Sequence, residues 1–69
     1  MKALTEITAI YLAKIEKSEA HDDLDILHVE MYLDLDAHRR YNTIHDIEIA
    51  KDKIITAIEN KRKTLTAKT

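Results

Sequence analysis

Apolar residues recur at helical spacing in three segments of the chain, and the last segment shows this most clearly. One stripe there consists of Ile44, Ile47, Ile54, Ile58 and Leu65. Residues three, four and seven apart lie on one face of an α-helix. Thr43 and Asp46 have the spacing of a capping box in which Asp replaces the usual Glu. The pattern predicts a helix over residues 43–65 and fraying of residues 64–69.

The first segment predicts another helix, over residues 2–19. Its stripe contains Leu4, Ile7, Tyr11 and Ile15, with Ala3 and Ile10 beside it. The positions between them are filled mostly by Ala, Glu and Lys, which favour or tolerate helices. Each end segment therefore has one main apolar face.

Residues 22–41 carry two apolar stripes instead of one. At 100° per residue, the first stripe contains Leu24, Leu27, Met31 and Leu35. The second lies on the opposite side and contains Ile26, Val29, Leu33 and Ala37. Asp22 or Asp23 is expected to cap the start of this helix. A helix that is apolar on both sides must be covered on both sides, inside a bundle or between its own chain and a partner.

The same middle segment also fits a β-strand. From position 27 to position 37, apolar residues at every second position alternate with His, Glu, Tyr and Asp. However, the apolar positions are mostly Leu, Met and Ala, and strands disfavour Asp. The chain also contains no Gly and no Pro, the residues that usually form turns and hairpins. We therefore predict an all-α bundle of two or three helices, with a strand–strand–helix dimer as the alternative.

The length of the chain allows one small domain over residues 1–69. A chain of this size buries only about 60% of the surface exposed by its unfolded form. Without Cys, Trp or Phe, it has no disulfide and must build its core from Ile, Leu and Ala. We therefore predict a homodimer, whose candidate interface residues are Leu24, Leu27, Met31, Leu35, Ile26, Val29 and Leu33.

Charge is distributed unevenly along the chain. Residues 1–36 hold three lysines against nine acidic residues, whereas residues 37–69 hold eight Lys or Arg against four acidic residues. Opposite halves attract when a chain folds back on itself or pairs antiparallel with a copy. No apolar stretch is long enough to span a membrane, and the first residues do not resemble a secretory signal. We expect a cytoplasmic protein that does not bind membranes.

Two residue clusters indicate alternative binding functions. His21, Asp25 and His28 lie one turn apart on a helix and could ligate a metal in a metal-responsive protein. Basic residues that could contact phosphates in a nucleic-acid-binding regulator are Arg39 and Arg40, beside Tyr41, and Lys61, Arg62 and Lys63. The sequence pI of about 6.0 does not favour nonspecific binding to a duplex.

No residue pattern in the chain indicates catalysis. A glycine-rich phosphate loop needs glycine, and Ser18 near His21 lacks the orienting group that a catalytic triad requires. We therefore predict a small non-enzymatic, homo-oligomeric protein-interaction or regulatory module without a cofactor. Adaptors and inhibitors, including accessory proteins of phages and plasmids, often have this size. Besides its own copy, the module is expected to bind another protein, whose identity the sequence does not indicate.

Overall fold

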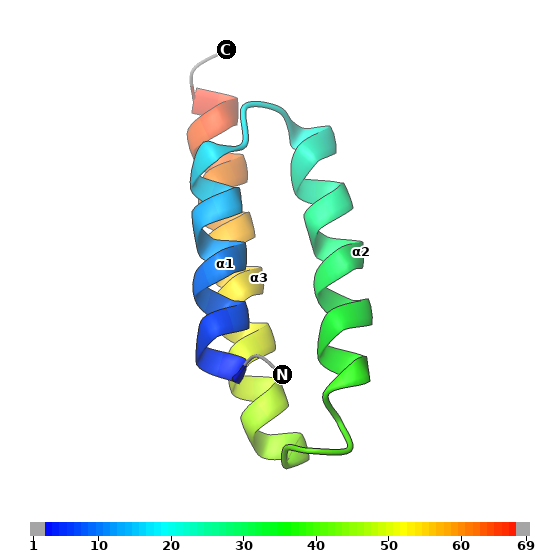
Figure 1. The fold of residues 1–69 in the computed structure, drawn as a ribbon. Coiled ribbons are helices and arrows are strands. Elements are labelled where there is room, and N and C mark those ends of the chain that lie inside the picture. The colour runs from blue at the N-terminus through cyan, green and yellow to red at the C-terminus, as the bar shows by residue number, and fades with distance from the viewer. Residues whose placement is uncertain (1–2, 68–69) are drawn as a thin grey trace.

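The computed structural model describes residues 3–67, which form three helices (Figure 1). Helix α1 spans Leu4–Lys17, α2 spans His21–Ala37 and α3 spans Ile44–Ala67. Consecutive helices run antiparallel, so α1 and α3 point in the same direction and α2 points in the opposite one (Figure 1). The described residues contain no strand and are 85% helical. The all-α prediction is confirmed, and the strand–strand–helix alternative is wrong.

Each helix contributes one apolar stripe to a common core. The buried residues are Ile7, Tyr11 and Ile15 of α1, Leu24, Leu27, Met31 and Leu35 of α2, and Ile47, Ala50, Ile54 and Ile58 of α3. Leu24, Met31, Leu35 and Ile54 are the largest fully buried side chains. Burying each such side chain stabilises the fold by about 1.5–3 kcal/mol relative to exposure. The core therefore lies on one side of α2, where both other helices pack.

The start of α3 follows the sequence prediction, but its stripe and its end do not. The backbone N–H of Asp46 donates to Thr43 Oγ1 at 3.1 Å, which confirms the predicted cap. Ile44 is 67% exposed, whereas Ile54 is fully buried. Ile44 lies ten positions before Ile54, and at 100° per residue this spacing points its side chain about 80° away from the core. Ala50 is buried instead. The prediction that residues 64–69 fray is wrong for residues 64–67, because α3 continues to Ala67. Residues 68–69 lie outside the described part of the chain.

Serine ends α1 and a short connection leads into α2. The Ser18 hydroxyl donates to the carbonyl of Lys14 at 2.9 Å, and its backbone N–H donates to the carbonyl of Ile15 at 3.1 Å. Helix α2 then begins one residue before the predicted caps, with Ala20 as N-cap and no side-chain hydrogen bond. The prediction that Asp22 or Asp23 caps α2 is therefore wrong. Both lie in its first turn, where carboxylates interact favourably with the helix dipole.

The chain reverses again after α2 without help from glycine or proline. Helix α2 ends at Ala37, four residues before the predicted end, because the backbone tightens into turns at this point. The N–H of His38 donates to the carbonyl of Leu35 at 3.1 Å, and the Asn42 side-chain amide donates to the carbonyl of His38 at 3.2 Å. No residue among 3–67 has a positive φ, so none of these turns requires glycine.

Candidate functional site

The two apolar stripes of α2 differ completely in exposure. Leu24, Leu27, Met31 and Leu35 are buried in the core formed by the chain itself. On the opposite side, Ile26 is 57% exposed, Val29 is 61% exposed and Leu33 is 68% exposed, and Ala37 is also exposed. We call these four residues the outer stripe. Of the predicted interface residues, only those of the outer stripe remain free to contact another molecule.

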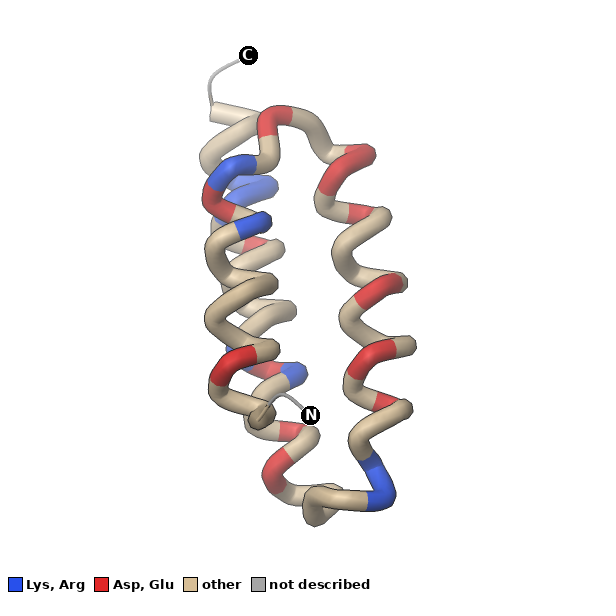
Figure 2. The backbone as a smooth tube through the Cα atoms, in the orientation of Figure 1, with Lys and Arg blue, Asp and Glu red and all other residues tan. Residues whose placement is uncertain are grey.

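Carboxylates border the outer stripe on both sides. At 100° per residue, Asp23 and Glu30 lie along one edge, and Asp25 and Asp36 lie along the other. The acidic residues of α2 are Asp22, Asp23, Asp25, Glu30, Asp34 and Asp36, and the helix contains no Lys or Arg. Figure 2 shows acidic positions along α2, whereas basic positions occur on α1, on α3 and in the turn that follows α2. The outer stripe is therefore an apolar ridge with acidic borders.

On one edge of α2, cationic side chains from α3 contact this acidic helix. Arg62 forms an ion pair with Asp25. Lys51 Nζ lies 5.6 Å from the centroid of the Tyr32 ring, a distance at which a cation is attracted to an aromatic face. Tyr32 also stacks on His28 with the ring centroids 5.0 Å apart. The pairing of α2 with α3 thus combines a buried apolar stripe with cations at its border.

On the other edge, α1 contacts α2 through a buried tyrosine. The Tyr11 hydroxyl donates a hydrogen bond to the Asp34 carboxylate. Burial, together with this hydrogen bond and the negative charge of Asp34, raises the pKa of Tyr11 well above its usual value. The phenol therefore stays neutral and acts as a donor that joins two helices. This contact is structural, because both partners belong to the packed bundle.

The predicted metal ligands do not form a metal site. His21 Nδ1 lies 3.4 Å from Arg62 Nη1, and the same Arg62 forms the ion pair with Asp25. His28 stacks on Tyr32. Among residues 3–67, no group of three His, Asp or Glu side chains is placed to hold a metal ion. The guanidinium of Arg62 already supplies the positive charge beside Asp25.

The two predicted basic clusters lie at opposite ends of the bundle. Arg39 and Arg40 lie in the turn after α2, whereas residues 61–63 lie near the C-terminal end of α3 (Figure 2). About 25 Å of helix separates the start of α3 from residue 61. Arg39 pairs with Asp36 at 3.3 Å, and Lys61 Nζ donates to the carbonyl of Glu16 at 2.8 Å. The structure therefore does not join these clusters into one basic surface.

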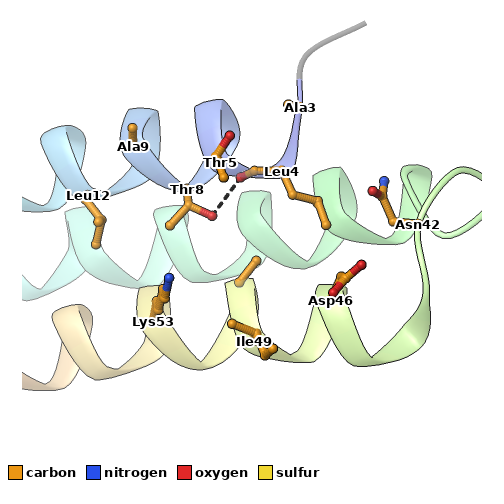
Figure 3. Close-up of a pocket in the computed structure, with 11 residues that line it drawn as sticks. Ala3, Leu4, Thr5, Thr8, Ala9, Leu12, Asn42, Asp46, Ile49 and Lys53 are labelled. Atoms are coloured by element: carbon orange, nitrogen blue, oxygen red, sulfur yellow. Dashed lines mark hydrogen bonds between the residues drawn. The ribbon is translucent and has the colours of Figure 1, made fainter.

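A groove between α1 and α3 is a feature that the sequence reasoning missed. It encloses about 470 Å³, and Figure 3 shows it between these two helices with α2 behind it. Leu12 and Ile49, which belong to neither predicted stripe, form part of its apolar wall. The ionisable side chains at the groove are Asp46 and Lys53. The sequence signal was one apolar residue beside the main stripe of each helix, Leu12 on α1 and Ile49 on α3.

Comparison with known proteins does not assign a function to any of these surfaces. No family model, curated protein or solved structure matches this chain. Within the described residues, no helix is both long enough and apolar enough to cross a membrane. Among the surfaces of the described residues, the outer stripe is the most exposed row of apolar side chains.

Proposed function

We propose that this protein is a non-catalytic interaction module that binds another protein through the outer stripe of α2. The supporting observation is that α2 is fully packed on one face and keeps a second, aligned apolar face exposed. A helix at the edge of a three-helix bundle needs only one apolar face for folding. Single exposed apolar residues are normal on protein surfaces, but an apolar row along one helix is typical of a contact surface.

The energetics support the same proposal. Covering a Leu, Ile or Val side chain that is otherwise exposed is worth about 1.5–3 kcal/mol when burial is complete. Ile26, Val29 and Leu33 are each more than half exposed, so a partner that covers them gains most of this energy. An adaptor or inhibitor of this size acts through such binding, without catalytic groups. In the homodimer that the sequence predicts, the outer stripe would be the interface, because the other stripe is already buried.

The test compares Leu33→Asp with the matched control Ile44→Asp. The two side chains are 68% and 67% exposed, and Ile44 belongs to α3 and is not part of the outer stripe. Tagged wild type and both variants are used to capture proteins from the cells that produce the chain, and captured proteins are then purified and titrated. We expect binding to wild type and Ile44→Asp, and loss of binding to Leu33→Asp. Unchanged binding by folded Leu33→Asp would contradict the proposal.

A further inference from the structure

The charge around the outer stripe selects the chemistry of the partner. We infer that the partner presents a basic amphipathic helix, whose apolar side chains cover the outer stripe while its Lys and Arg face the flanking carboxylates. This inference rests on the proposed function, because it assumes that the outer stripe is a binding surface. It adds the shape and the charge of the bound segment.

The shape follows from the spacing of the stripe. Ile26, Val29, Leu33 and Ala37 are separated by three, four and four residues, so they form a continuous ridge over about three helical turns. Helices recognise each other by packing such ridges against apolar residues at positions i, i+3, i+4 and i+7 of the partner. A helix is therefore the segment that matches this surface best in length and periodicity.

The charge follows from the borders of the stripe. Ion pairs within residues 3–67 involve Asp25 and Asp36 of α2, but none involves Asp22, Asp23 or Glu30. These three carboxylates lie on or beside the outer stripe by helical geometry. A partner that covers the stripe must bring its own flanking residues close to them. Lys and Arg at those flanks attract, whereas Asp and Glu repel.

The molecule already contains a helix pair of this kind. Helix α3 packs against the inner face of α2 through its apolar residues, such as Ile54, while Arg62 and Lys51 contact Asp25 and Tyr32 at the border. A basic amphipathic helix on the outer face would repeat this arrangement on the opposite side of α2. The arrangement of α3 on α2 therefore provides the physical template for the bound partner.

A second copy of the chain fits this surface less well. Two α2 helices that meet through their outer stripes would bring the unpaired carboxylates Asp22, Asp23 and Glu30 of one copy close to those of the other, without a Lys or Arg on either helix. Like charges across an interface oppose association. Basic side chains of a second copy are available on α1 and α3, but that contact would join different surfaces head to tail instead of forming a closed dimer. Nucleic acid and anionic lipid carry the same charge as α2 and are repelled for the same reason.

The experiment uses synthetic peptides of 18 residues as probes. Two fluorescently labelled peptides share the same leucines at i, i+3, i+4 and i+7, and their flanking positions are all Lys in one and all Glu in the other. A third peptide keeps the lysines but distributes the leucines around the helix. Binding to the full chain is measured by fluorescence anisotropy at low and at moderate salt. We expect the Lys peptide to bind at least about tenfold more tightly than either other peptide, and less tightly as salt rises.

The variants separate recognition by the stripe from general charge attraction. Leu33→Asp removes an apolar contact and adds a negative charge, so nonspecific attraction of the Lys peptide would increase. Weakening by about tenfold or more in Leu33→Asp, with little change in Ile44→Asp, would support the inference. Equal binding of the Lys and Glu peptides, or unchanged binding of the Lys peptide to Leu33→Asp, would overturn it.

Light scattering distinguishes failure of the inference from failure of the proposed function. If neither peptide binds but wild type forms a dimer that Leu33→Asp dissociates, the outer stripe is an interface between copies. In that outcome the basic helix is wrong, and the proposed binding of another protein stands only if a captured protein still binds wild type and Ile44→Asp but not Leu33→Asp. If the peptides do not bind and Leu33→Asp changes no association with a second copy or a captured protein, both proposals are wrong.

Discussion

The inner and outer faces of α2 have similar side chains and opposite environments. Leu24, Leu27, Met31 and Leu35 lie inside the bundle, whereas Ile26, Val29 and Leu33 are more than half exposed. Hydrophobicity alone does not explain this difference, because Ile26, Val29 and Leu33 are large apolar residues like those of the inner face. The difference arises because α1 and α3 both pack on the same side of α2 (Figure 1). An apolar stripe thus has a structural role on one face and is available for binding on the other.

The most severe test of this comparison places a charge on each face. Met31→Asp buries a carboxylate at a fully buried position, which we expect to cost more than about 4 kcal/mol and to unfold the chain. Leu33→Asp lies in solvent, and we expect it to cost only about 1 kcal/mol, because Asp is a weaker helix former than Leu and adds a negative charge near Glu30 and Asp36. Circular dichroism during urea denaturation measures both. A cooperatively folded Met31→Asp variant would contradict the assignment of the inner face.

A milder test removes the same side chain from each face. Leu35 is 1% exposed and Leu33 is 68% exposed, so they form a matched pair on one helix. Leu35→Ala is expected to lower the free energy of unfolding by about 2–5 kcal/mol, because it creates a cavity in the core. Leu33→Ala is expected to remain within about 0.5 kcal/mol of wild type. Similar losses for the two variants in urea denaturation would mean that the outer stripe is covered in solution.

The edge of α2 that contacts α1 can be tested through pH. In the unfolded chain Tyr11 ionises near its ordinary pKa of 10.0, whereas in the folded chain burial and Asp34 raise that pKa. The folded state therefore holds the phenol proton more tightly, and this contribution to stability is present below pH 10 and is lost as the pH rises above it. The loss has a limiting slope of about 1.4 kcal/mol per pH unit. Thermal denaturation at pH 9–11 should show that the Tm of Tyr11→Phe falls less steeply with pH than the Tm of wild type. Equal slopes for the two proteins would contradict the role assigned to the Tyr11–Asp34 contact.

The edge that contacts α3 is expected to give the smallest effect. Arg62→Gln removes the cation beside Asp25, whose side chain is 65% exposed. Ion pairs with exposed partners contribute about 0.2–1 kcal/mol, and salt screens them. Urea denaturation at low salt should therefore show a small destabilisation that disappears near 1 M NaCl. If Arg62→Gln lowered the free energy of unfolding as much as Leu35→Ala does, this border contact would be as important to stability as the core.

The ambiguity between helix and strand in the middle segment has a simple geometric cause. On a helix, residues two apart point about 200° away from each other, so a strictly alternating sequence forms two opposite stripes. On a strand, the same alternation forms one apolar face and one polar face. Pattern alone therefore cannot separate a helix with two apolar faces from a strand. Packing against α1 and α3 decides for the helix, because it buries Leu24, Leu27, Met31 and Leu35 together.

The sequence by itself favoured helices over strands and determined the Thr43 cap and the membership of both α2 stripes, because these depend on local periodicity and on side chains close in the chain. The predicted end of α2 at residue 41 and the placement of Ile44 in the core stripe are wrong, because the backbone tightens into turns after Ala37 and Ile44 lies about 80° around the helix from buried Ile54. The sequence also could not choose which α2 stripe forms the core. Only the tertiary structure decided that choice, because burial depends on contacts between helices that are distant in the chain, and α1 and α3 together cover one face of α2.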